Sequence, residues 1–166
     1  MAKPLATLSV AFWYRMDDDN GYDKSYIVSN GCIFDANTTD FRAGGWCFVG
    51  YGKTVEADAY FDPKLGNVNA VRSDALTTKT WHHIAVTWNN TAYPATCAMY
   101  IDGKLAKSGA SGAGFNPMEP IGANNNDLRI GPHWGWWMQY ENTASFCDLR
   151  VYKRILNTAE ITALAR

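Results

Sequence analysis

The run Trp81-His82-His83-Ile84-Ala85-Val86-Thr87-Trp88 decides the fold, together with Met99-Tyr100-Ile101-Asp102-Gly103-Lys104 that follows it. In the first run, every second residue from Ile84 to Trp88 is apolar, which predicts a strand with one face in a core. The second run ends in Asp-Gly, the strongest short signal for a hairpin turn, and the chain continues into a matching return strand. The two runs therefore predict a central strand followed by a β-hairpin.

Three ordered motifs resemble the laminin G-like, concanavalin A-like lectin and glucanase family of jelly rolls. They are the Trp-His-His strand at Trp81, the Tyr-Ile-Asp-Gly-Lys hairpin at Tyr100, and the closing segment 148–161. The resemblance runs from about Leu8 to the C-terminus. It implies an all-β, antiparallel β-sandwich of the concanavalin A-like kind with one short C-terminal helix, forming a single domain over residues 1–166. It leaves the activity open, because this fold includes lectins, glycosidases and interaction modules.

Further strands are expected where apolar and polar residues alternate between turn-forming clusters. We expect strands at residues 8–16, 25–29, 45–50, 57–61, 68–72, 128–131 and 145–152, and a loop at 108–126. Asn157, with Glu160 three residues later, predicts an N-capped helix at 158–165. The resembling family carries one more strand before the segment matching 10–16, so the resemblance implies an uncovered sheet edge here.

The composition excludes some classes of function. The 166 residues, 47% of them hydrophobic, suffice for one domain with its own core. Because 15 Lys and Arg nearly balance 16 Asp and Glu, we expect no nucleic-acid partner. No apolar run approaches the roughly 20 residues of a membrane span, so no membrane insertion is expected. The chain shows no signal-peptide pattern at its start, and we expect the domain on an extracellular or virion surface.

The four cysteines show no Cys-x-x-Cys pairing, so a zinc site is not expected. We interpret them as buried thiols rather than disulfides. Cys147 alternates with Leu149 and Val151, and is therefore predicted to face the core.

The seven tryptophans exceed what a core of this size needs, which indicates a contact surface. The aromatic segment at residues 133–140 is the most distinctive stretch. Its candidate ligand-binding residues are Trp134, Trp136, Trp137, Tyr140, His133 and Gln139. Indole rings stack on pyranose rings and are also favoured anchors of protein interfaces, while a third alternative is a lid over the core. The segment predicts a non-enzymatic surface recognition module that binds glycans or a protein partner.

The acidic loop at residues 17–23 places oxygen ligands at alternate positions, as calcium loops do, but it lacks the glycine and glutamate of an EF-hand. The resemblance implies calcium at a sheet rim, held by scattered carboxylates. The calcium candidates are Asp17, Asp19, Asp23, Asp127 and Asp148. A solvated turn is the alternative interpretation.

Two other functions stay open. The resembling β-glucanases use a Glu-x-Asp-x-x-Glu or Glu-x-Asp-x-Glu strand, and here Glu56 and Asp58 share a face while Asp62 replaces the second glutamate. We therefore expect no catalytic residue and interpret Glu56 and Asp58 as the solvated outer face of a strand. The remaining alternative is a structural decoration or fibre-associated protein of a virus particle or similar assembly, with self-association through the open edge.

Overall fold

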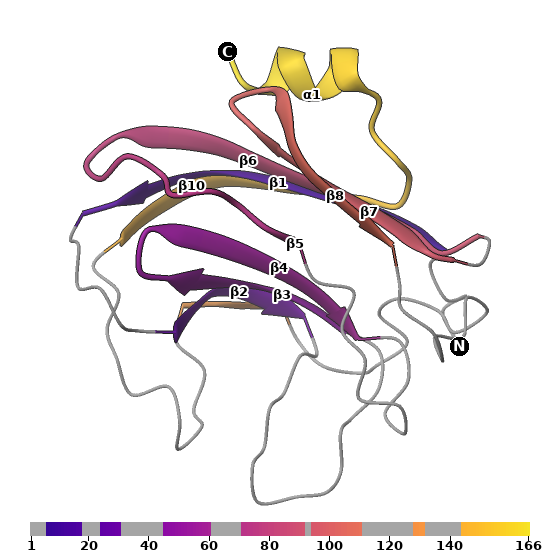
Figure 1. Cartoon of the computed structure of the whole chain (residues 1–166), viewed down its shortest axis with the longest axis horizontal. Coiled ribbons are helices and arrows are strands. Elements are labelled where there is room, and N and C mark those ends of the chain that lie inside the picture. Colours follow the sequence, from indigo (N-terminus) through magenta and orange to yellow (C-terminus); the bar gives the residue numbers. More distant parts are fainter. Residues whose placement is uncertain are drawn as a thin grey trace, which may run out of the picture.

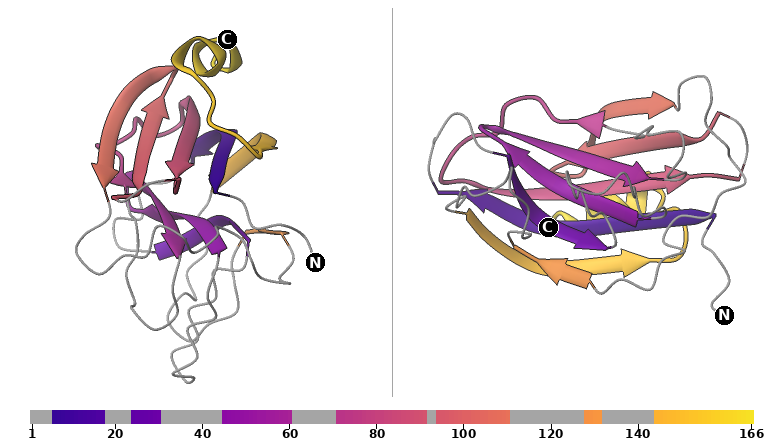
Figure 2. Two further views of the ribbon diagram at one scale, coloured as in Figure 1. Left: turned by 90° about the vertical axis from the view of Figure 1, so that its right-hand side faces the viewer. Right: turned by 90° about the horizontal axis from the view of Figure 1, so that it is seen from below.

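The computed structural model describes residues 6–17, 24–30, 45–60, 71–91, 94–110, 128–131 and 144–166, which form two antiparallel sheets packed face to face (Figure 1). The first sheet has the order β10-β1-β6-β7-β8 and the second the order β5-β4-β3-β2-β9. Helix α1 stands on the outer side of the first sheet, away from the second (Figure 2). The prediction of an all-β sandwich with one short C-terminal helix is confirmed.

The strands agree with most of the expected ranges. The first sheet contains β1 (Thr7–Met16), β6 (Trp81–Asn89), β7 (Thr96–Ile101), β8 (Lys104–Ala110) and β10 (Ala144–Tyr152). The second contains β2 (Lys24–Asn30), β3 (Gly45–Tyr51), β4 (Thr54–Tyr60), β5 (Val71–Arg72) and β9 (Leu128–Ile130). β4 begins three residues earlier than expected, because its pairing with β3 continues to the turn. Residues 108–110 are strand rather than loop, because they pair with the start of β7.

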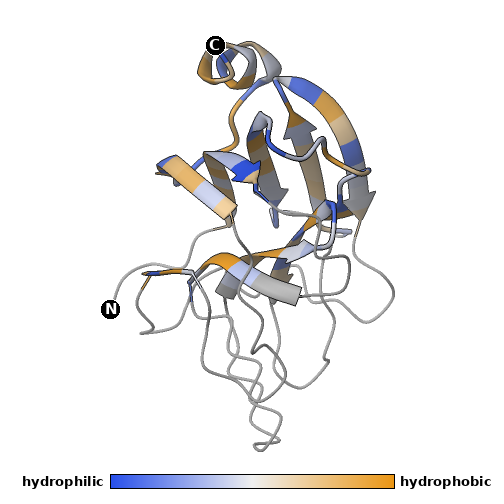
Figure 3. Cartoon of the chain, turned by 90° about the vertical axis from the view of Figure 1, so that its left-hand side faces the viewer, coloured by the Kyte–Doolittle hydropathy of each residue, from blue (hydrophilic) through white to orange (hydrophobic). Residues whose placement is uncertain are grey.

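The core lies between the two sheets and follows the alternation in the sequence. The even-numbered residues of β1 from Leu8 to Met16 are buried, as are the apolar residues of β6 from Ile84 to Trp88. The ring centroid of Phe12 on the first sheet lies 4.8 Å from that of Phe48 on the second, at 89°. Phe48 also contacts Trp88 edge-on at 5.8 Å. These aromatic contacts join the sheets, and the alternation of apolar and polar residues is visible along the strands in Figure 3.

Helix α1 (Thr158–Leu164) covers part of the outer face of the first sheet. Ile161 packs with Ala11 and Ala85 of that face. The hydroxyl of Ser9 on β1 anchors the connection to the helix, since it donates to the Arg154 carbonyl at 2.7 Å and accepts from the Leu156 N–H at 3.0 Å. The predicted capping box of Asn157 and Glu160 is present, which confirms the helix start.

Strand β10 contains a β-bulge that overturns one prediction. Ala11 pairs with Arg150 and Trp13 with Cys147, so two residues of β10 oppose the single residue Phe12. One of the two, Asp148, has φ +53°, the left-handed conformation. The bulge interrupts the alternation, so Leu149 packs against the core while Cys147 lies exposed beside Trp13. The prediction that Cys147 faces the core is wrong for this reason.

The edge implied by the missing family strand is strand β10, which has no partner on its outer side among the described strands. The bulge and a two-bond ion pair between Arg150 and Asp148, with both N···O distances 2.9 Å, make this edge irregular and charged. At the opposite edge of the sheet, β8 carries Lys104 and Lys107. Bulges and edge lysines are the features that keep an exposed strand from pairing with another chain.

Candidate functional site

The predicted aromatic site lies outside the described residues. This holds for His133, Trp134, Trp136, Trp137, Gln139 and Tyr140. Their role in ligand binding stays a prediction.

Two of the five calcium candidates are described, and each is paired with an arginine. Asp17 accepts hydrogen bonds from Arg15 Nε at 2.6 Å and from Ser145 Oγ at 2.9 Å, which hold the pKa of its carboxyl below the usual range. Arg150 lowers the pKa of Asp148 in the same way. In the described part of the chain, no three His, Cys, Asp or Glu side chains gather to hold a metal. Asp19, Asp23 and Asp127 lie outside it, so a calcium site there stays a prediction.

Glu56 lies on the outer face of β4, as predicted, and is bound by an arginine. Arg72 Nε donates to Glu56 Oε2 at 2.6 Å. The same guanidinium lies over the ring of Tyr51, 4.2 Å from its centroid. Glu56 is therefore held in an ion pair with a cation that also stacks on an aromatic ring.

Asp58 lies on the same face but is only 6% exposed, so the expectation of a solvated face is wrong at this residue. The thiol of Cys47, directly opposite on β3, donates to Asp58 Oδ2 at 3.8 Å. Tyr26, Cys47 and Val49 form a second buried cluster on the outer side of this sheet. Asp62, the third acid of the predicted motif, lies outside the described residues. Among the described residues, the outer face around Asp58 is thus packed, with Cys47 directly against its carboxylate.

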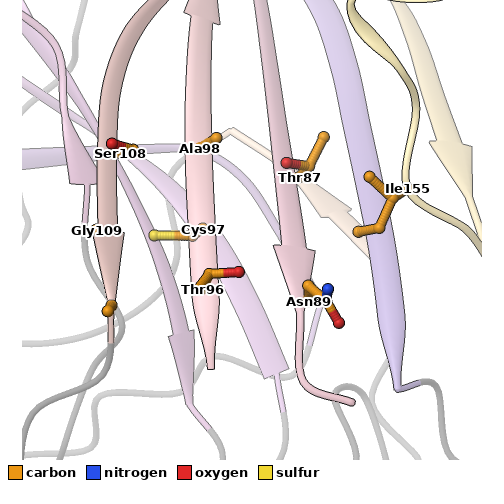
Figure 4. Close-up of a pocket in the computed structure, with 9 residues that line it drawn as sticks. Thr87, Asn89, Thr96, Cys97, Ala98, Ser108, Gly109 and Ile155 are labelled. Atoms are coloured by element: carbon orange, nitrogen blue, oxygen red, sulfur yellow. The ribbon is translucent and has the colours of Figure 1, made fainter. Parts of the chain in front are cut away.

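An open groove of about 570 Å³ lies on the outer face of the first sheet (Figure 4). Its floor consists of small residues from three strands. Thr87, Asn89, Thr96 and Ser108 are polar, Cys97, Ala98, Gly109 and Ala110 lie between them, and Ile155 lines the groove from the segment before α1. Asn89 Oδ1 accepts bonds from the Thr91 backbone N–H and hydroxyl at 3.1 and 2.7 Å, outside the groove lining. The floor offers neutral hydroxyl and amide groups and carries no charged side chain.

The four described tryptophans divide into two pairs. Trp46 and Trp88 are buried between the sheets, with ring centroids 6.5 Å apart. Trp13 and Trp81 lie instead on the outer face of the first sheet, and Trp81 is 38% exposed. The contact surface predicted from the sequence covers only residues 133–140 and does not include these two tryptophans. Their positions in the alternating pattern would have identified these two tryptophans. Each falls on the outward-facing side of a strand whose inward-facing residues are apolar.

The sheet order and the capped helix define a β-sandwich of the lectin and glucanase class. The family described as the concanavalin A-like lectin/glucanases superfamily matches residues 2–162, and this chain belongs to it. The chain is also similar to the Sushi, von Willebrand factor type A, EGF and pentraxin domain-containing protein 1 of Rattus norvegicus, with 26% identity over 167 residues. That match covers 86% of this chain but only 4% of the rat protein.

Among solved structures, the fold is similar to the binding domains of botulinum neurotoxins. For the serotype D/C binding domain the TM-score is 0.65 at 13% identity, covering 97% of this chain and 36% of that one. A second similar structure is of botulinum neurotoxin type C, whose cell entry depends on interaction with two ganglioside molecules. Its TM-score is 0.65 at 14% identity, covering 96% of this chain and 35% of that one. A DC binding domain in complex with rat synaptotagmin II has a TM-score of 0.62 at 14% identity, covering 97% and 35%. At such identities the likeness shows the fold alone.

Proposed function

We propose that this protein is a non-catalytic recognition domain that binds glycans or a protein partner, outside the cell or on a particle surface. The observation that carries the proposal is the state of Glu56 and Asp58, the first two acids of the glucanase-like motif. Glu56 is ion-paired with Arg72, and Asp58 is buried against the Cys47 thiol. A retaining glycosidase instead needs two carboxyl groups about 5–5.5 Å apart in an accessible cleft.

Membership of the superfamily supports a recognition role, since lectins belong to it. Among the proteins of similar fold, cell entry of botulinum neurotoxin type C depends on interaction with two ganglioside molecules, and a DC binding domain forms a complex with rat synaptotagmin II. These are ligands of those proteins, and the fold shared with this chain makes up 35% of each of those chains. The aromatic segment 133–140 supplies the contact residues in this proposal, because indole rings serve both glycan stacking and protein anchoring.

The alternative of a structural assembly protein receives no support from the two edges of the first sheet. Assembly by strand pairing needs a regular edge, whereas β10 has a bulge at Asp148 and β8 carries edge lysines. Light scattering on the native protein tests this alternative. A defined oligomer that is lost on replacing Trp134, Trp136 and Trp137 by Ala would make the aromatic segment an assembly surface.

The proposal itself is tested by glycan-array binding and by binding of candidate receptor domains. We expect wild-type protein to bind at least one ligand class, and the triple tryptophan variant to lose that binding while keeping its circular-dichroism spectrum. Leu105→Ala, which truncates an exposed side chain of β8, is the matched control and should bind normally. Release of reducing sugar from β-glucan that disappears in Glu56→Gln would overturn the proposal in favour of a glycosidase.

A further inference from the structure

The outer face of the first sheet carries a cluster of aromatic and charged side chains from β10, β1 and β6. These three strands lie side by side (Figure 1). Trp13 and Arg15 point to this face, because the residues between and beside them on β1 point into the core. Arg15 pairs with Trp81 of β6 on one side and with Ser145 of β10 on the other. Trp13 is diagonal to Trp81, and such neighbours lie roughly 7–8 Å apart. The two indoles thus flank one arginine on a single surface.

Arg15 is held from three directions. Its Nε donates to Asp17 Oδ1 at 2.6 Å and its Nη2 donates to Ser145 Oγ at 3.2 Å. Its guanidinium carbon lies 5.2 Å from the ring centroid of Trp81. The Ser145 hydroxyl in turn donates to Asp17 Oδ2 at 2.9 Å. A guanidinium and a carboxylate fixed in this way lose little conformational freedom when a ligand binds.

The cluster is open to solvent. Trp81 is 38% exposed, and the side chains of Arg15 and Asp17 are 36% and 31% exposed. Trp13 is half-buried, with its ring edge-on to His83 at a centroid distance of 5.4 Å, which fixes the orientation of the indole. Exposed aromatic rings beside oriented polar groups are a feature of binding sites.

We propose that Trp13, Trp81, Arg15 and Asp17 bind a neutral pyranose ring of a glycan. This inference rests on the recognition role proposed above and names its ligand class. An indole accepts the apolar face of a pyranose by stacking. The sugar hydroxyls donate to the lone pairs of Asp17 that Arg15 and Ser145 leave open, and accept from the remaining Arg15 N–H groups.

The charge of the site supports a neutral ligand. The charges of Arg15 and Asp17 balance within their ion pair, so the pair itself offers an anionic sugar no net attraction. The charge of Lys79 also acts on Asp17, and the heparin fragments in the test below measure whether it attracts an anionic sugar. The hydrogen bond from Arg15 also lowers the pKa of Asp17, which keeps the carboxylate ionised as an acceptor in neutral and mildly acidic solution.

A structural role for the same residues makes a different prediction. If the contact between Arg15 and Trp81 only stabilises the pairing of β1 with β6, truncating Trp81 lowers stability and leaves glycan binding unchanged. Glycan affinity and the fluorescence response of Trp81 to bound sugar therefore separate the two roles.

The test measures binding of neutral cello-, manno- and galacto-oligosaccharides and of sulfated heparin fragments to the full chain, on an array and then by tryptophan fluorescence. We expect a neutral oligosaccharide to bind, and Trp81→Ala to weaken that binding about tenfold or more, the loss of one aromatic anchor. Trp81→Phe should retain part of the affinity and Asp17→Ala should lose most of it. Val151→Ala, which truncates an exposed apolar residue of the same sheet, is the control and should bind normally.

Several results would overturn this site. One such result is neutral-sugar binding that survives in Trp81→Ala and Asp17→Ala but is lost on replacing Trp134, Trp136 and Trp137. It would overturn the site at Trp81 and agree with the proposed recognition function. Binding of a protein receptor and of no glycan would also overturn the site while agreeing with the recognition function. A preference for heparin fragments would overturn the assignment of a neutral sugar as the ligand. A chain that binds neither glycan nor protein fails both proposals. If Trp81→Ala does not fold, Trp81→Phe and Asp17→Ala decide the result.

Discussion

The carboxylate of Asp102 accepts a hydrogen bond from the backbone N–H of His83, with 2.9 Å between Oδ1 and N. The backbone N–H of Asp102 returns a bond to the His83 carbonyl at 2.8 Å. These two bonds tie the turn between β7 and β8 to the start of β6. The turn and the start of β6 are the two sequence motifs that predicted the fold. Asp102 has φ +51°, a conformation that aspartate tolerates better than most residues.

The first prediction concerns this link. Asp102→Ala should lower the free energy of unfolding by about 1–2 kcal/mol, because it removes the acceptor of a backbone N–H and places Ala in the left-handed region. Asp102→Asn keeps an acceptor for the His83 N–H and the backbone tolerance, and should lose less. Urea unfolding followed by tryptophan fluorescence measures both variants. Equal losses would mean that the carboxylate acts through its other contact, with His82 Nδ1 at 2.9 Å, rather than through the bond to His83.

The second prediction concerns the glycine that follows. Gly103 has φ +77°, and a Cβ added there would lie 3.1 Å from the Cα of Thr162 in α1. Gly103→Ala therefore combines backbone strain with a clash against the helix, and we expect it to cost more than about 1–2 kcal/mol. Gly131 has φ +89° but open space around its Cα, so Gly131→Ala isolates the backbone strain and should cost less. If Gly131→Ala is the more damaging variant in thermal unfolding, the contact with α1 is unimportant.

The third prediction is a pH dependence at the start of α1. Two bonds from Arg154, at 2.7 and 2.9 Å, and one from the Asn157 N–H lower the pKa of Glu160 from 4.5 to about 2. Since the folded pKa is the lower one, the stabilisation is complete above about pH 4.5 and is lost as the pH falls toward about 2. Wild type should thus exceed Glu160→Gln in urea midpoint near neutral pH, and the difference should shrink in acid. A difference that stays constant down to about pH 2 would contradict this.

The fourth prediction concerns thiol reactivity. Within the described residues, Cys47, Cys97 and Cys147 form no disulfide, and only Cys147 is exposed. Burial raises the pKa of Cys97 to about 12, so its thiolate is absent at neutral pH. Iodoacetamide should label Cys147 in the native protein and label Cys47 and Cys97 only in denaturant, as mapped by peptide mass spectrometry. Equal labelling of Cys97 and Cys147 in the native state would place Cys97 at the surface.

The fifth prediction concerns the contact between the sheets. Phe48 is fully buried and touches Phe12, Trp46 and Trp88. Phe48→Ala should cost about 3–5 kcal/mol through the cavity it leaves. Leu105→Ala removes a side chain that is 58% exposed and should stay within about 0.5 kcal/mol of wild type. A small loss for Phe48→Ala in denaturant unfolding would show that the two sheets can close the cavity.

Much of the fold was predictable because its signals are local. The alternation from Leu8 to Met16 gave the buried face of β1, and Asn157 with Glu160 gave the start of the helix. Both depend on residues within a few positions of each other. The same alternation failed at Cys147, because the bulge in β10 is set by pairing with β1, which lies more than 130 residues away.

The sequence by itself determined the sandwich, its family and most of its strands, because hydrophobic period, turn residues and caps act over short distances. Only the tertiary structure decided what the charged and aromatic side chains do. Pairing of β4 with β5 placed Arg72 on Glu56, and pairing of β10, β1 and β6 gathered Ser145, Arg15 and Trp81 on one face. These neighbours come from distant segments of the chain, and the register of the strands alone brings their side chains into contact.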